Sequence, residues 1–248
     1  MRKLLKEGHI ATIYREQDYV YKVYDPLYPE EWIDKEIYIH NLIRKETDLT
    51  VLTLEKKNAH TIKMPFLAAP SLETTLFNNP YDPAWHVFTE LQNQIHQYEG
   101  FDLEPAHLVF KRRLELSWLS DEIREIALAI LAKLPVQTQL CHFDFQPSHV
   151  IQTENKLTIL DWLHAKQGHP MMDIANTYVL LRLQNSDVAL HYLQGICEMT
   201  DYQSNMIYSI IPLMAALQLL ETDDIYKHKV LTTLIYDPEN TKVTLMET

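Results

Sequence analysis

Along the first third of the chain, apolar and polar positions alternate with the two-residue period of β-strands. Two pairs of such stretches are rich in β-branched and aromatic residues: ATIYRE (11–16) with YVYKVYDP (19–26), and LTVLTLEKK (49–57) with HTIKMPFL (60–67). Short polar segments separate the members of each pair, and Asn58 lies in the second of them. The pattern therefore predicts two β-hairpins.

Between the two hairpins the apolar period changes to that of a helix. Pro29 is followed by two glutamates, and acidic residues in a first turn suit the positive end of the helix dipole. Ile33, Ile37 and Ile43 then recur near one face. We therefore expect an antiparallel sheet that carries one helix, in the order β, β, β, α, β, β.

Beyond residue 68 the pattern becomes mainly helical. Helical periodicity is present in segments 84–98, 105–118 and 120–133, and again from Met171 to about residue 235. Two short β-segments interrupt it, a strand at QTQLCHF (137–143) and a hairpin at VIQTENKLTILDW (150–162) that turns at Glu154-Asn155.

The change near residue 68 predicts two lobes of an α+β fold. Residues 1–68 would form a small lobe, an antiparallel sheet with one helix. Residues 69–248 would form a larger, mainly helical lobe.

The net charge of −12 restricts the classes of partner that we expect to bind. An acidic surface repels nucleic acid and anionic membranes, so neither is expected to bind. The start MRKLLKEGHI lacks the apolar core of a signal peptide, and no run reaches the ~18 apolar residues of a membrane span. With two cysteines, Cys141 and Cys197, and no disulfide framework, we expect a cytoplasmic protein.

The polar run CHFDFQPSHV (141–150) carries the first candidate chemistry. In the catalytic loop of a kinase, an Asp base is followed after four residues by an Asn that binds the metal. Asp144 lies at the position of the base and His149 at that of the Asn. The alternative is a structural hydrogen-bonding pair, which a lone His-x-Asp in a loop often forms.

Two further positions extend this pattern. Asp161 ends the apolar approach ILDW, where a carboxylate at the mouth of a hairpin suits a metal ligand. Lys22 lies among apolar and aromatic residues in YVYKVY, so it needs a partner such as Glu36 to offset its desolvation. Kinases use such a Lys–Glu pair to hold nucleotide phosphates. The alternatives are an ordinary strand-end Asp and a lysine on the wet face of an edge strand.

In this order the segments resemble the aminoglycoside phosphotransferase and choline kinase family, a small-molecule branch of the protein-kinase-like fold. EGHIATIYRE (7–16) resembles the family's phosphate-covering loop, and KMPFL (63–67) its entry to the hinge between lobes. CHFDFQPSHVI is similar to His-Gly-Asp-x-x-Pro-x-Asn-Val-x. The family's block Asp-Trp-x-x-Ala-x-x-Gly-x-Pro-x-x-Asp-x-Ala is matched at Asp161, Trp162, Ala165, Gly168, Pro170, Asp173 and Ala175.

The resemblance implies a bilobal, protein-kinase-like fold and an enzyme that transfers the γ-phosphate of ATP to a hydroxyl of a small molecule with the help of magnesium. It implies that Asp144 is the catalytic base, Asp161 the main metal ligand, Lys22 a contact to phosphates and Glu36 its partner. By the same resemblance, further nucleotide contacts are Gly8 in the phosphate loop and Met64 and Phe66 at the hinge. His142 and Asp173 would support the catalytic loop.

The sequence departs from the family pattern at two positions of this loop. Phe143 replaces a Gly, and His149 replaces the metal-binding Asn. Magnesium prefers oxygen ligands, whereas imidazole suits softer metals such as manganese. His149 therefore either binds such a metal, or contacts phosphate and leaves Asp161 as the sole protein ligand, or marks a site with little activity. The last case is the alternative hypothesis, a pseudokinase-like module that binds a nucleotide or other ligand without transfer.

The acceptor pocket is expected in the helical region after residue 171. Acidic residues and tyrosines in this region would suit a cationic amine acceptor. The alternative is that the acidic residues lie at solvated helix ends and the tyrosines in the core. The residues concerned are Glu198, Asp201, Glu221, Asp223, Asp224, Tyr178, Tyr192 and Tyr202. A protein kinase is disfavoured, because Asp161 is followed by Trp-Leu rather than Phe-Gly.

Overall fold

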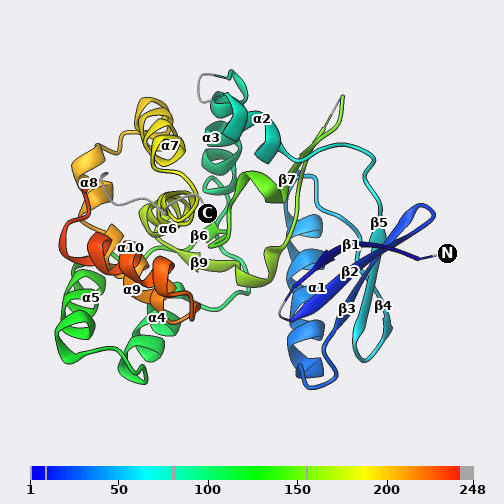
Figure 1. Ribbon diagram of the computed structural model, residues 1–248, viewed down its shortest axis with the longest axis horizontal. Coiled ribbons are helices and arrows are strands. Elements are labelled where there is room, and N and C mark those ends of the chain that lie inside the picture. Colours follow the sequence, from blue (N-terminus) through cyan, green and yellow to red (C-terminus); the bar gives the residue numbers. More distant parts are fainter. Residues whose placement is uncertain (1, 9, 80–81, 155, 241–248) are drawn as a thin grey trace. The chain divides into compact units, whose positions relative to one another are not determined.

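A computed structural model describes residues 2–8, 10–79, 82–154 and 156–240 (Figure 1). Contacts divide the chain into two compact units. The first comprises Met1–Glu73 and Ser148–Leu163, and the second comprises Thr74–Pro147 and His164–Thr248. The predicted division at residue 68 differs from these units by a few residues and by the segment 148–163, which belongs to the first unit.

The first unit is built on a five-stranded antiparallel sheet with strand order β1-β2-β3-β5-β4. Its strands are β1 (Lys3–Glu7), β2 (Ala11–Glu16), β3 (Tyr19–Tyr24), β4 (Glu55–Asn58) and β5 (Thr61–Pro65). Both predicted hairpins are present. The first strand of the second hairpin begins at Glu55 rather than residue 49, because Val51 forms a bridge with Ile159 instead.

Helix α1 (Glu30–Glu46) lies against the sheet of the first unit (Figure 1). Of the three isoleucines predicted to share a face, Ile33 and Ile43 are fully buried and Ile37 is partly buried. Ile33 packs with Tyr24 and Ile62 of the sheet in one apolar cluster. Burial of this stripe stabilises the helix in water and fixes the direction of the polar side chains beside it.

The hairpin predicted for residues 150–162 is present as β7 (Val150–Gln152) and β8 (Leu157–Ile159). Its predicted turn includes Asn155, which lies outside the described residues. The amide of Ile159 donates to the carbonyl of Thr50 at 3.1 Å, and this bond ties the hairpin to the first unit.

The second unit is mainly helical, and its helices follow the predicted segments closely. They are α3 (Ala84–Ile95), α4 (Ala106–Glu115), α5 (Asp121–Lys133), α6 (Pro170–Arg182), α7 (Ser186–Met199), α8 (Ser204–Tyr208), α9 (Ile211–Leu219) and α10 (Ile225–Tyr236). A shorter helix, α2 (Leu72–Asn78), precedes them. Two three-residue strands, β6 (Gln139–Cys141) and β9 (Lys166–Gly168), pair antiparallel.

Helices α6 and α9 form the core of the second unit. In α6, twelve residues are buried, polar ones among them, and α9 is apolar except at Gln218. A helix that is apolar all round is expected to be buried. Within the described residues, every helix is too short or too polar to cross a membrane.

Candidate active site

Lys22 on β3 is the centre of a charged cluster in the first unit. Its Nζ lies 2.9 Å from Oε1 of Glu36 on α1 and 3.3 Å from Oδ1 of Asp161 after β8. The Lys22 side chain is 15% exposed and that of Glu36 is 3% exposed, whereas that of Asp161 is 38% exposed. The structure thus brings together three residues that the sequence predicted separately.

A buried hydroxyl completes this cluster. Tyr24 donates a hydrogen bond to Oε2 of Glu36, so both oxygens of this carboxylate have partners. Burial alone would lower the pKa of the Lys22 ammonium, but the carboxylates of Asp161 and Glu36 raise it well above its usual value. Lys22 is therefore a permanent cation at physiological pH.

Asp161 and His149 lie together at the end of the β7–β8 hairpin. The Leu160 amide donates to the carbonyl of His149 at 2.8 Å, and the donor atoms of His149 and Asp161 lie within 4.8 Å of one another. Asp161 has a φ of 59°, in the left-handed region that is uncommon for residues other than glycine. An imidazole nitrogen and a partly exposed carboxylate at this separation could share a divalent cation.

The other predicted nucleotide contacts also lie in the first unit. Gly8 follows β1, and its amide donates to the carbonyl of Ala11 at 3.1 Å; residue 9 of the predicted phosphate loop lies outside the described residues. Met64 on β5 packs against the core of the unit. The Phe66 ring lies 3.7 Å from the guanidinium carbon of Arg15.

In the second unit, the predicted catalytic loop begins with an unusual backbone conformation. Phe143 has a φ of 57°, which explains why the family pattern has glycine here. Its amide donates to Oδ1 of Asp173 at 2.5 Å, and its carbonyl accepts from Nδ2 of Asn176 at 2.8 Å. Both partners lie on α6, so this helix binds the amide and the carbonyl of Phe143, the residue before Asp144.

Asp173 is fully buried and is satisfied by three donors. Its Oδ2 lies 2.8 Å from Nε2 of His96 and accepts from Nε2 of Gln92 at 3.2 Å. Burial alone would raise the pKa of the Asp173 carboxyl, but His96 and the amide of Phe143 lower it below its usual value. Asp173 is thus a buried anion that supports the loop, as the resemblance implied for this position.

Asp144 itself is half-buried and lines an open hollow of the second unit. Its Oδ1 accepts from Nε2 of Gln146 at 2.6 Å, and its amide donates to Nδ1 of His142 at 3.2 Å. The predicted acceptor residues are mostly elsewhere. Only Glu221 of that set lines this hollow, and Tyr178 and Tyr192 are fully buried in the core.

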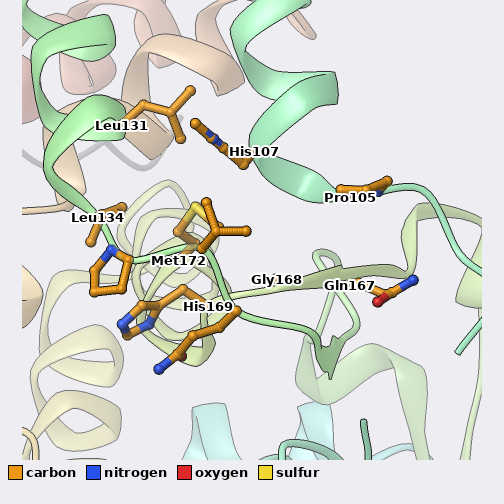
Figure 2. A pocket seen from close by; sticks show the side chains of 11 residues that line it. Pro105, His107, Leu131, Leu134, Gln167, Gly168, His169 and Met172 are labelled. Atoms are coloured by element: carbon orange, nitrogen blue, oxygen red, sulfur yellow. The ribbon is translucent and has the colours of Figure 1, made fainter. Parts of the chain in front are cut away.

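A second hollow of this unit lies between α4 and the end of α5 (Figure 2). Figure 2 shows His107 extending from α4 toward Leu131, whereas His169 lies farther away, on the other side of Met172. Both ring nitrogens of His107 are buried without a hydrogen-bond partner. Among the described residues that line this hollow there is no Asp or Glu, so it lacks the carboxylate that serves as the base in the kinase template.

Two side-chain amides that support this loop, those of Asn176 and Gln218, were not predicted from the sequence. Asn176 links Phe143 to α9, because its Oδ1 accepts from Nε2 of Gln218 at 2.9 Å. Asn176 lies three residues after Asp173, a spacing that places both on one face of a helix. This spacing was the available signal, whereas the position of Gln218 depends on packing between helices.

Solved structures share this fold over nearly the whole chain. The macrolide 2'-phosphotransferase MphH from Brachybacterium faecium is 17% identical, with 96% of this chain and 93% of that chain covered and a TM-score of 0.58. A thermostable mutant of aminoglycoside phosphotransferase APH(4)-Ia, in a ternary complex with AMP-PNP and hygromycin B, is 13% identical, with coverages of 96% and 94% and a TM-score of 0.70. A choline/ethanolamine kinase family protein from Mesorhizobium loti is 12% identical, with coverages of 97% and 82% and a TM-score of 0.63.

These similarities confirm the predicted α+β, protein-kinase-like fold. No curated protein sequence matches the chain significantly. The sequence profile of the phosphotransferase enzyme family (APH), however, matches residues 3–204, which is most of the chain. The chain therefore belongs to the phosphotransferase enzyme family.

Proposed function

We propose that the protein transfers the γ-phosphate of ATP to a hydroxyl group of a small molecule in a metal-dependent reaction. The observation that carries this proposal is the Lys22 ammonium, held at 2.9 Å from Glu36 and 3.3 Å from Asp161. A largely buried cation fixed by two carboxylates can hold phosphate oxygens in place, and positioning of this kind accounts for most of the catalysis of phosphoryl transfer.

Asp161 and His149 are the proposed protein ligands of the metal. They fit a divalent ion in donor chemistry, since Asp161 offers a carboxylate and His149 an imidazole within 4.8 Å. A bound magnesium or manganese ion would supply positive charge against the phosphates. Gly8, Met64 and Phe66 remain proposed contacts of the nucleotide.

Asp144 is the proposed general base. The acceptor oxygen forms a bond to the γ-phosphorus while the bond from this phosphorus to the bridging oxygen of ADP breaks. The hydroxyl proton passes to the Asp144 carboxylate, and ADP leaves with the electron pair of the broken bond. Gln146 donates to Oδ1 of this carboxylate at 2.6 Å and helps to hold it in place.

Calorimetric titration with ATP, first with magnesium and then with manganese, tests the nucleotide site. We expect metal-dependent binding that Asp161→Asn weakens at least tenfold.

A panel of sugars, amino alcohols, hydroxy acids and macrolides, assayed by ADP release, then tests transfer. Asp144→Asn should lower turnover by about 10²- to 10⁴-fold with ATP affinity nearly unchanged. Absence of nucleotide binding with either metal would overturn the proposal.

A second candidate function is nucleotide binding without transfer. His149 motivates it, because the family pattern has an Asn ligand at this position. His149→Asn separates the two functions. A large gain in ATP turnover would identify the native chain as a binding module, whereas a loss would identify His149 as a working ligand.

A further inference from the structure

A third hollow of the second unit lies between α3 and α7, which pack side by side (Figure 1). Counting its open mouth, it encloses about 960 Å³, the size of a small-molecule site. Its described lining residues come from positions 82–89, around the start of α3, and from positions 191–199 in α7. None of them lines the hollow around Asp144 or the one around His107. We call this separate hollow the α3–α7 groove.

Gly195 allows the two helices to approach closely at this groove. A Cβ at this position would lie 3.3 Å from Cγ2 of Thr89 on α3, which is tighter than most contacts of this kind. Glycine in the middle of a helix is less favourable than alanine. A larger residue at position 195 would push the helices apart or project into the groove. The glycine therefore serves the shape of the groove rather than the stability of α7.

The lining of the α3–α7 groove is acidic. Asp82 accepts from the amide of Ala84 at 2.9 Å, and Glu198 accepts from Nε2 of Gln194 at 2.8 Å. Both donors are uncharged, so these bonds leave the two carboxylates with their negative charges. The described lining residues include no Lys or Arg. Because Glu198 also lies in the last turn of α7, where the helix dipole is negative, the groove attracts cations.

Trp85 gives the groove an aromatic side with an unused donor. Its side chain is 6% exposed, and its indole Nε1 is buried without an acceptor among the described residues. A buried N–H without a partner costs free energy, and an oxygen of a bound ligand would supply the acceptor. Met199, at the end of α7, adds an adaptable apolar side chain to the lining.

We propose that the α3–α7 groove binds a small organic amine that carries an apolar ring and an oxygen acceptor. The acidic lining at Asp82 and Glu198 holds the ammonium group. The ring lies on Trp85 and Met199, and the oxygen accepts from the Trp85 indole. Glu198 is one of the acidic residues expected at the acceptor pocket, but this site is separate from Asp144. The inference goes beyond the proposed function, because binding here needs neither nucleotide nor metal.

Three matched phenyl ethers test the inference by calorimetry with the full chain at pH 8, where imidazoles are ordinarily neutral. Phenoxyethylamine is cationic, phenoxyethanol is neutral and phenoxyacetate is anionic, while all three carry the same ring and ether oxygen. Glu198→Gln and Asp82→Asn should each weaken binding of the amine about threefold and leave that of the alcohol unchanged. Because two carboxylates contribute, we expect the amine to bind about tenfold more tightly than the alcohol. Phenoxyacetate should not bind.

Glu125→Gln is the matched control, because Glu125 is exposed on α5 and the change in net charge is the same. It should leave the affinity for the amine unchanged. NMR of the indole N–H groups, assigned by substitution of each tryptophan in turn, locates the site. The amine should shift the signal of Trp85 and not that of Trp118, which is exposed.

Four outcomes of these experiments would overturn the inference. They are no binding of the amine, an amine that binds no more tightly than the alcohol, an equal effect of Glu125→Gln and Glu198→Gln, and an unshifted Trp85 signal.

Discussion

At the scale of single residues, Phe143 couples backbone strain to packing. Its φ of 57° disfavours any side chain, yet its ring is 6% exposed and packs on Phe110. Phe143→Ala should lose the packing and keep the strain, whereas Phe143→Gly should lose the packing and relieve the strain. We therefore expect Phe143→Gly to be more stable than Phe143→Ala by about 1 kcal/mol in urea unfolding.

Phe145 provides the control for this comparison. It is fully buried nearby, and its φ is not positive. Phe145→Gly should be less stable than Phe145→Ala, as at most positions. The same order at both sites would show that Phe143 bears no strain.

The Tyr24 hydroxyl illustrates how a buried anion depends on each of its donors. It donates to the Glu36 carboxylate, and burial raises its pKa, so it stays protonated throughout the physiological range. Tyr24→Phe should lower the free energy of unfolding by about 1.5–3 kcal/mol, because a hydrogen bond to a charged group is lost. Urea unfolding measures the loss. Tyr19→Phe, which removes an exposed hydroxyl from the same strand, should change stability by less than about 0.5 kcal/mol.

Asp173 gives a prediction for pH dependence. Its folded-state pKa is lowered, so its contribution to stability is present above the unfolded value of about 3.9 and is lost as the pH falls through the folded value. Asp173→Asn should cost about 3 kcal/mol between pH 5 and 8. The difference from the unaltered chain should shrink below about pH 4, as measured by urea unfolding across this range. A difference independent of pH would contradict the ionic role, and exposed Glu125→Gln should show little difference at any pH.

At the scale of elements, helix α7 depends on its first turn. The Asn185 side chain accepts from the amides of Asp187 at 2.9 Å and Val188 at 3.1 Å, which would otherwise lack partners in the helix. Asn185→Ala should therefore destabilise the second unit by about 1 kcal/mol. Ser120→Ala at the start of α5 is the comparison. It removes a single longer bond of 3.4 Å, so its shift in urea midpoint should be smaller.

Among the elements, some could be predicted from the sequence and others could not. Apolar period and helix-start residues are local signals, so α1 and both N-terminal hairpins could be predicted from them. The pairing of β6 with β9 involves three residues on each strand, too few for a periodic pattern. Likewise, Lys22, Glu36 and Asp161 each have a local reason to be chosen, but the ion pair of Lys22 with Asp161 depends on the hairpin docking on the first unit. That docking is a long-range contact, which no local pattern encodes.

At the scale of the whole molecule, the first unit is discontinuous in sequence. The segment 148–163 contributes Val150, Ile159 and Trp162, all fully buried. The Trp162 amide donates to Nε2 of His40 on α1 at 3.3 Å, and the Ile159 amide donates to Thr50. Without this segment, part of the apolar surface of α1 and its neighbours would face water.

We therefore predict that residues 1–73 expressed alone do not fold cooperatively, whereas residues 1–73 joined to 148–163 by a flexible linker do. The linker costs only the entropy of closing a loop, which rises slowly with length, and the segment restores the buried side chains. Near-UV circular dichroism and urea unfolding distinguish a packed unit from a collapsed chain. A sigmoidal transition in the shorter fragment would show that the N-terminal sheet and α1 suffice. In that case Asp161 would reach Lys22 by docking on a preformed unit rather than by taking part in its folding.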